Sequence, residues 1–461
     1  MLQLRTYSRL ARLFSTEAVP KATKKARSAK PPREYKIPSD LVEYFASINQ
    51  QNLLEQFSPK MLRKKHKFPD SYYIASPEAA KLIADYVSKP AASAKVILES
   101  NPGPGLLSEH LARSSATKIH LFESDDNFEK KLQDTYSGQG KRIRIQRGDL
   151  VNMWRIGFQD REDNGTRLQE LLAGVPSKSW SSKPMRFFAA VGSLNFFKYL
   201  IYSIVRQSDI FTHGRFEMFL VVPPPLYIHL TCNAQAGYIM YRANTILFQI
   251  MFEYEYLTKI PKKCFLPWQY DHKPEKLKKL TRFYSIDADY LYLVKITPRA
   301  DIYDLCPLEF MQALLYFVKQ NCVSRKHRVI PTLEKWAPGC GPRLIIGTDN
   351  PCGVKPLHRN GDHEIPQYST QCTTMSNKDL YPSMNIFTEF GDLTPSQILT
   401  LFTQFRQWPE FKESPFLASL ENSLLKMETS EQEATIEGLD LHEEDFVGSE
   451  GNTKSSSKRN S

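Results

Sequence analysis

Apolar and polar residues alternate along the middle of the chain in two rhythms. Six short apolar runs have the length of buried β-strands, at residues 95–100, 118–123, 143–148, 187–192, 216–222 and 290–296. Segments with helical spacing lie between most of them, at residues 106–113, 126–136 and 196–207. This alternation predicts an α/β fold with a mostly parallel sheet and helices on both faces. Such sheets bind ligands at the carboxyl ends of their strands.

The pattern changes on either side of this region. Residues 39–62 favour helices with a break near Pro59, and residues 76–88 favour a helix with Ser76 as N-cap and Pro77 at its first position. From Pro307 onward the spacing favours a smaller helical domain, with helices at residues 308–320 and 394–405. Past residue 427 the chain is rich in Glu and Ser and poor in aromatic residues, which is typical of a disordered tail.

The first sixteen residues have the composition of a mitochondrial presequence. Arg5, Arg9 and Arg12 are interspersed with leucines, and the segment contains no acidic residue. A disordered basic tail is the alternative. Residues 17–38 continue the basic character and favour a linker or a nucleic-acid-binding arm. We therefore expect a protein of the mitochondrial matrix.

The net charge of +11 is unevenly distributed over the 461 residues. Residues 428–461 hold nine acidic and three basic residues, which leaves +17 on the first 427. A body this basic favours a polyanionic partner, although matrix and ribosome-associated proteins are often basic as well. The basic run at residues 60–67 could contact phosphate or form a solvated face. No apolar run is long enough to span a bilayer.

The seven cysteines have no paired spacing, which favours free thiols in a reducing compartment. The densest group of thiols and imidazoles lacks the C-x-x-C pair that zinc sites usually contain. We expect no metal site there. The members of this group are Cys340, Cys352, His358, His363 and Cys372.

The chemistry of the chain concentrates at a glycine turn. The apolar run at residues 96–98 ends in Glu99, and Gly103 and Gly105 follow in Asn-Pro-Gly-Pro-Gly just before a helix. Two glycines allow a ligand to approach the backbone closely. Two further strands end in acids, Glu123 and Asp149. Glu123 lies about twenty residues after the turn, where a carboxylate can accept hydrogen bonds from ribose hydroxyls.

A dinucleotide-binding enzyme of the dehydrogenase type is a weak alternative. Its G-x-G-x-x-G turn would need a third glycine where Ser108 stands, and a phosphate-binding Gly-Lys-Ser/Thr motif does not occur.

The three acidic motifs together resemble the S-adenosylmethionine pocket of the rRNA adenine dimethyltransferase family. Residues 238–260 resemble its characteristic helix and following strand, and residues 261–268 resemble its V-P-P-x-x-F-x-P loop. The form Glu-Ser-Asn-Pro-Gly-Pro-Gly most resembles one branch of this family, mitochondrial transcription factor B. The resemblance implies a Rossmann-like class I methyltransferase fold with a smaller C-terminal helical domain. It also implies cofactor contacts from Ile74, Glu99, Gly103, Gly105, Glu123 and Asp149.

With this resemblance the expected organisation has five parts. They are a presequence at 1–16, a basic linker at 17–38, a methyltransferase-like domain at 39–300, a helical domain at 301–427 and an acidic tail at 428–461.

The chain departs from the family where the target adenine binds. The family has Asn-Leu-Pro-Tyr after its fourth strand, where the amide holds the amino group of the flipped base and the ring stacks on it. Here Ser193-Leu194-Asn195-Phe196 occupies that place. Ser193 lacks the amide, although Phe196 could still stack, and Phe265 corresponds to the aromatic residue of the later loop. Losing one such polar contact commonly lowers the rate by about two orders of magnitude. The site is therefore predicted to be degenerate, with methyl transfer weak or lost and cofactor binding retained.

Two functions remain open from the sequence. The first is a mitochondrial transcription initiation factor that helps mitochondrial RNA polymerase to melt promoter DNA. Its candidate nucleic-acid contacts are Arg325, Lys326, His327, Arg328, Lys262 and Lys263, although the 325–328 run could equally be a solvated helix end. The second is an active dimethyltransferase that modifies adenines of mitochondrial small-subunit rRNA.

Overall fold

The computed structural model describes residues 37–89, 96–235, 240–270, 286–323, 325–346 and 384–433. All of these except Ile37 belong to one compact unit, Pro38–Ser461. The expected presequence lies outside the described residues, as does the expected disordered tail after Glu433. The start of that tail was predicted wrongly, because residues 428–433 form the end of a helix, Pro415–Glu433. The division of the remainder at residue 300 stays a prediction.

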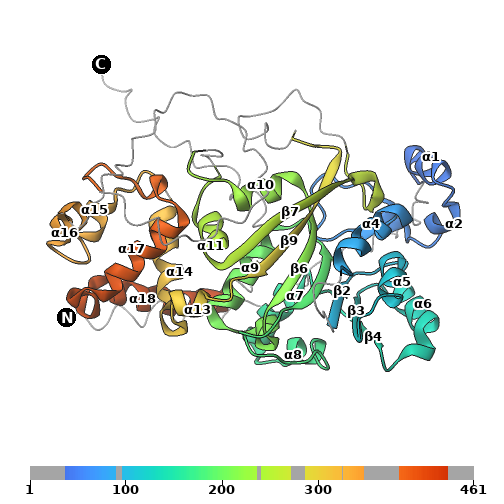
Figure 1. The fold of residues 1–461 in the computed structure, drawn as a ribbon, viewed down its shortest axis with the longest axis horizontal. Coiled ribbons are helices and arrows are strands. Elements are labelled where there is room, and N and C mark those ends of the chain that lie inside the picture. The colour runs from blue at the N-terminus through green and yellow to red at the C-terminus, as the bar shows by residue number, and fades with distance from the viewer. Residues whose placement is uncertain are drawn as a thin grey trace, which may run out of the picture. The chain divides into compact units, whose positions relative to one another are not determined.

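A seven-stranded sheet forms the centre, in the order β4-β3-β2-β5-β6-β9-β7 (Figure 1). Five neighbouring strands are parallel, while β9 is antiparallel to both β6 and β7. The bounds are β2 (Val96–Ser100), β3 (Lys118–Glu123), β4 (Ile143–Arg147), β5 (Met185–Ala190), β6 (Phe216–Val222), β7 (Phe252–Pro261) and β9 (Tyr290–Pro298). The prediction of a mostly parallel sheet is confirmed.

Successive strand residues point to opposite faces of the sheet and enter different cores. One face carries Leu98, Phe187 and Leu220, and the other carries Ile97, Phe188 and Val221. The second face is covered by α4 (Pro77–Val87), α5 (Leu106–Ala112) and α6 (Asp126–Tyr136). Ser76 caps α4 as expected, because its hydroxyl accepts from the Ala79 N–H at 3.3 Å.

The buried core on the first face continues into a larger set of helices. They are α7 (Met153–Asp163), α8 (Arg167–Leu171), α9 (Leu194–Arg206), α10 (Pro224–Thr231), α11 (Ala243–Met251), α13 (Ile302–Leu305), α14 (Leu308–Cys322), α15 (Val329–Leu333), α16 (Cys340–Ile346), α17 (Pro395–Gln407) and α18 (Pro415–Glu433). Short 3-10 turns join several elements: η1 (Ser137–Gln139), η2 (Asp209–His213), η3 (Lys262–Cys264), η5 (Phe390–Asp392) and η6 (Pro409–Glu413).

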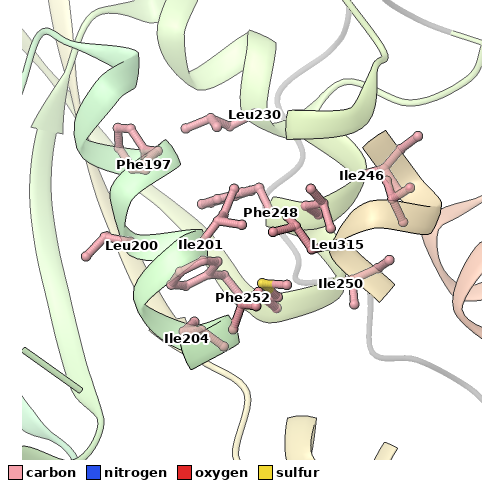
Figure 2. Close-up of a cluster of buried hydrophobic side chains, with 14 of the residues drawn as sticks. Phe197, Leu200, Ile201, Ile204, Leu230, Ile246, Phe248, Ile250, Phe252 and Leu315 are labelled. Carbon is pink, nitrogen blue, oxygen red and sulfur yellow. The ribbon is translucent and has the colours of Figure 1, made fainter. Parts of the chain in front are cut away.

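Helices α9, α11 and α14 meet in the middle of this core (Figure 2). Phe197 of α9 packs edge-to-face on Phe248 of α11, with ring centroids 5.9 Å apart. Leu315 of α14 lies beside them (Figure 2). The same buried cluster therefore joins the sheet to the C-terminal helices.

The N-terminal helices form a third cluster at one end of the sheet. They are α1 (Ser39–Ser47), α2 (Gln51–Leu54) and α3 (Pro59–Leu62), and Asn49 separates the first two by its left-handed conformation at φ 53°. A two-stranded antiparallel ladder, β1 (Tyr73–Ile74) with β8 (Phe265–Leu266), lies under them. This arrangement brings residues 39–62 close to the glycine turn.

Candidate functional site

The glycine turn lies between the end of β2 and the start of α5, as predicted. Asn101, Gly103 and Gly105 all adopt left-handed backbone conformations, with φ of 54°, 59° and 89°. A Cβ atom on Gly103 would lie 2.7 Å from Cδ1 of Tyr73, so the turn needs glycine both for its conformation and for this close approach.

Glu123, at the end of β3, is fully buried and already makes hydrogen bonds with both carboxylate oxygens. One oxygen accepts from the Gly103 N–H at 2.8 Å. The other accepts from the Tyr73 hydroxyl at 3.3 Å and from the N–H groups of Ser124 and Asp125 at 2.8 and 2.9 Å. Burial raises the pKa of Glu123 to about 7, although the backbone N–H groups oppose this shift.

Asp149 follows β4 and is held by a second network. Its oxygens accept from the Asn101 side-chain amide at 2.9 Å, from the Val151 N–H at 2.9 Å and from the Asn152 side chain at 2.7 Å. The side-chain oxygen of Asn101, Oδ1, in turn accepts from the Ser124 hydroxyl at 3.2 Å. Asn101 thus links the ends of three neighbouring strands.

Glu99 is almost completely buried, like Glu123. It is 1% exposed and accepts a hydrogen bond from the Ser108 hydroxyl of α5 at 2.8 Å. Burial raises the pKa of Glu99 to about 8, and repulsion from Glu123 adds to the shift. The carboxyl is therefore largely neutral at pH 7 and joins β2 to α5.

An aromatic group covers the turn. The ring of Tyr73 packs against Phe57 and Phe128, with centroids 6.3 and 5.6 Å away, and these two rings are 5.4 Å apart. Beside them Lys131 donates to the Pro104 carbonyl at 3.2 Å and to the Gln56 side chain at 2.5 Å. We name Phe57, Tyr73 and Phe128 the aromatic cover.

Ile74 and Phe265 lie next to this cover as partners in the β1–β8 ladder, and both are buried. The ring of Phe265 belongs to the core beside α4 and α5. Neither face of this ring is open to a base in this structure.

The residues expected to bind the target base have structural roles instead: Ser193 begins a helix, and Phe196 lies in the hydrophobic core. Ser193 is the N-cap of α9, and its hydroxyl accepts from the Asn195 N–H at 3.3 Å. Phe196 is 0% exposed, and its ring packs on that of Phe187 with the ring centroids 6.3 Å apart. The stacking role expected for Phe196 is therefore excluded in this arrangement, because its ring lies inside the protein.

A chain segment also lies across the end of β5. The Gly192 N–H donates to the Asp70 carbonyl at 2.9 Å, and the Tyr72 N–H donates to the Ala190 carbonyl at 3.1 Å. Residues 69–72 thus occupy the backbone edge next to Ser193.

Comparison with known proteins identifies the family of the chain. The model of the family described as "Ribosomal RNA adenine dimethylase" matches residues 62–321. The chain is 47% identical over 396 residues to "Dimethyladenosine transferase 2, mitochondrial" of Drosophila melanogaster, which covers 84% of this chain and 88% of that protein.

The chain belongs to the ribosomal RNA adenine dimethylase family.

More distant members show smaller likenesses. The protein of the same name from Mus musculus is 22% identical over 285 residues, or 60% of this chain and 70% of that one. A crystal structure of a dimethyladenosine transferase from Plasmodium falciparum covers 73% of this chain and 98% of its own, with 13% identity and a TM-score of 0.41. The fold is that of class I S-adenosylmethionine methyltransferases: strands alternate with helices, and an antiparallel strand, β9, completes the sheet beyond β6.

Enzymes of the dimethylase family use S-adenosylmethionine, so the site can be tested for its fit to that cofactor. An acid at the end of β3 would need free acceptor positions for the ribose hydroxyls. Glu123 gives one oxygen to Gly103 and the other to Tyr73, Ser124 and Asp125, and the Tyr73 ring lies on Gly103. Asp149 also uses both its oxygens within the chain. Because the Tyr73 hydroxyl and ring take the position at Glu123 and Gly103, the residues present do not fit the cofactor in this arrangement.

The predicted nucleic-acid residues separate into exposed and buried ones. Lys326, His327 and Arg328 are exposed before α15. Arg325 is only 8% exposed and donates to the Gly391 and Ala234 carbonyls at 2.7 and 3.3 Å. Both the nucleic-acid role and the solvated helix end expected for Arg325 are wrong, because its guanidinium is used inside the fold.

Lys262 and Lys263, in contrast, lie in the turn η3, where the Lys263 carbonyl accepts from the indole N–H of Trp268 at 3.2 Å. Lys263 is exposed, and Lys262 is half-buried with its ammonium 3.6 Å from Asp289. The Lys65 N–H donates to the Trp268 carbonyl at 2.8 Å, and the Tyr270 N–H donates to the Lys65 carbonyl at 2.9 Å. Two basic segments distant in sequence are thereby brought together.

An aromatic pair completes this region, because His66 stacks on Tyr270 with centroids 4.4 Å apart. Sequence reasoning noted the charge run but missed this pairing. We name the region the basic strip and define it by Lys60, Arg63, Lys65, His66, Lys263 and Tyr270.

Tyr73 and Asn101 are the main site residues that sequence reasoning missed. A signal existed for Asn101, because it occupies the turn just before two glycines and asparagine tolerates the left-handed conformation.

The described ranges contain no cluster of three His, Cys, Asp or Glu side chains suited to a metal ion. Of the candidate group, only Cys340 is described, and it is buried. Within the same ranges, no helix has both the length and the apolar character needed to cross a membrane.

Proposed function

We propose that this chain is a mitochondrial transcription initiation factor, the second paralogue of mitochondrial transcription factor B. It acts in the matrix nucleoid, where it helps mitochondrial RNA polymerase to open promoter DNA. The presequence at 1–16, the basic linker at 17–38, the methyltransferase-like domain at 39–300, the helical domain at 301–427 and the acidic tail at 428–461 are parts of this proposal. The mitochondrial names of the relatives support the location.

The observation that carries the proposal is the target-base side of the site. A methylating enzyme needs a polar group and an exposed ring there. In this chain Ser193 caps α9, Phe196 lies in the core, and residues 69–72 cover the adjoining backbone. A dimethylase fold that lacks the polar group and the exposed ring still has its overall shape and its positive charge. Shape and charge suit the binding of nucleic acid rather than methyl transfer.

The basic strip supports a single-stranded nucleic acid as the bound polymer. Proteins of this kind combine cations along the phosphate backbone with aromatic rings on which bases stack. Lys60, Arg63 and Lys263 are exposed, and His66 with Tyr270 supplies exposed rings. We assign the separated promoter strand to this surface, with Lys326, His327 and Arg328 as further contacts.

The first experiment measures promoter opening. A base analogue that fluoresces when unstacked is placed near the start site of a mitochondrial promoter, and purified mitochondrial RNA polymerase is added. Fluorescence should rise when the full chain is present and stay low when polymerase acts alone. Equal signals with and without the chain would exclude the proposed role.

A second experiment tests the basic strip directly. Arg63→Ala with Lys263→Ala should reduce the salt dependence of single-stranded DNA binding by about 0.7 per lost phosphate contact, or about 1.4 in the logarithmic slope. Lys130→Ala with Lys141→Ala removes the same charge from exposed positions on and after α6 and serves as the control. Identical slopes for the two double variants would contradict the assignment.

The alternative is an active dimethylase that modifies adenines of mitochondrial small-subunit rRNA. The printed name of the relatives, dimethyladenosine transferase, favours it. It is tested by transfer of labelled methyl groups from S-adenosylmethionine to the rRNA hairpin. We expect no incorporation above that of an Asp149→Ala variant. Clear incorporation that Asp149→Ala abolishes would favour the enzyme.

A further inference from the structure

The Tyr73 hydroxyl stands where a ribose hydroxyl of the cofactor would be expected. In nucleotide-binding α/β folds the acid after the second strand of the unit accepts from ribose. Glu123 holds that place, and Tyr73 donates to it at 3.3 Å. The phenol oxygen is thus a stand-in for the sugar oxygen.

The Tyr73 ring also occupies the space above the turn. Its Cδ1 atom lies 2.7 Å from the position of a Cβ on Gly103, so the ring lies directly against this glycine. Gly103 itself donates to Glu123, so the turn, the acid and the tyrosine form one closed group. A ribose cannot enter this group without displacing the ring.

The surroundings hold Tyr73 in place from two sides. Phe57 and Phe128 contact the ring, and only 8% of the residue is exposed. Its backbone belongs to the β1–β8 ladder, where Tyr73 pairs with Leu266. The tyrosine is therefore part of a packed core and not a side chain at the rim of an open pocket.

The adenine side is closed in a related way. Asn101 takes the left-handed position next to the glycines and donates to Asp149 at 2.9 Å. With Asn152 donating to its second oxygen at 2.7 Å, the carboxylate of Asp149 is satisfied by the chain itself.

We infer that Tyr73 is a built-in occupant of the cofactor's ribose position, so that the native chain does not bind S-adenosylmethionine or S-adenosylhomocysteine there. The inference concerns this chain's own site and goes beyond the proposed role at promoters. It replaces the expectation that cofactor binding is retained.

The test is calorimetric titration of the purified chain with S-adenosylhomocysteine, accompanied by a thermal shift measurement with the same ligand. The native chain should give neither saturable heat nor a shift. Tyr73→Ala removes the ring and frees Glu123, and it should bind at least about tenfold more tightly than the native chain. Tyr73→Phe keeps the ring on Gly103 and should stay closed, which separates occupancy from loss of the hydroxyl.

Further variants make the outcome decisive. Glu123→Ala added to Tyr73→Ala should abolish the gained binding, because the ribose loses its acceptor. If Tyr73→Ala does not fold, Tyr73→Leu keeps apolar contact with Phe57 and Phe128 while removing the ring. Saturable binding by the native chain, or its absence in both folded Tyr73 variants, would overturn the inference. The titration contains no polymerase or promoter, so it can fail without affecting the promoter experiment.

Discussion

The pH dependence of stability at Glu99 tests whether the carboxyl end of β2 is buried away from water. The carboxyl is 1% exposed, and burial raises its pKa from 4.5 to about 8. Between these two pH values the folded chain holds a proton that the unfolded chain has lost. Stability is therefore greatest below pH 4.5 and falls as the pH rises toward 8, by about 1.4 kcal/mol per pH unit for this group.

Replacing Glu99 by Gln keeps the shape of the neutral acid and its bond from Ser108. The variant no longer has to take up a proton on folding. Near pH 7.5, three units above the ordinary pKa, it should be more stable than the native chain by about 4 kcal/mol, and the two should converge near pH 4.5. Part of the slope should remain in the variant, because burial also raises the pKa of Glu123 to about 7.

The assay is denaturant unfolding followed at several pH values between 4.5 and 8. Glu109→Gln is the matched control, since Glu109 lies on α5 next to Ser108, is exposed and pairs with Arg113 at the surface. Parallel stability curves for the native chain and Glu99→Gln would refute the reasoning, because they would mean that Glu99 is ionised in the folded protein.

Three other substitutions probe the same geometry. Gly103→Ala should lower stability by about 2 kcal/mol in thermal unfolding, and by less in a Tyr73→Ala background; equal losses in both would show that Tyr73 is not the obstacle. Arg325→Ala should cost about 3 kcal/mol in denaturant unfolding while exposed Lys326→Ala changes stability by under about 0.5 kcal/mol, and similar values for the two would contradict the burial of Arg325. Phe196→Ala should cost about 4 kcal/mol by the same measurement, whereas a loss below about 1 kcal/mol would place the ring outside the core.

The main sheet could be predicted because each strand is a short apolar run between helical segments. The limits of the elements were less accurate. The run at 187–192 becomes β5 (Met185–Ala190), since the Gly192 N–H bonds to the Asp70 carbonyl rather than to a strand. Helix α9 begins two residues before the expected position because Ser193 caps it.

The acids and glycines of the site were also predictable, because their spacing along the chain reflects the ends of neighbouring strands. The contact of Tyr73 with these residues could not be predicted. The bond from Tyr73 to Glu123 joins residues 50 apart, and the β1–β8 ladder has only two residues in each strand. Such short pairings leave no periodicity that a sequence reader can detect.

Arg325 illustrates the same difficulty for charge. Within Arg-Lys-His-Arg it has the composition of a solvated run, yet its acceptors are the carbonyls of Ala234 and Gly391, 91 and 66 residues away. Burial of an arginine depends on acceptors that only the folded chain brings together, so local composition could not distinguish Arg325 from Lys326.

The β1–β8 ladder has a consequence for the order of events during synthesis. Tyr73 leaves the ribosome almost two hundred residues before Leu266, the residue with which its backbone pairs. The acid and the turn, Glu123 and Gly103, also emerge before that partner. Until β8 arrives, a nascent chain has these groups without the ladder that fixes the tyrosine over them. Tyr73 is therefore fixed against Gly103 and Glu123 only after β8 has been synthesised and has paired with β1.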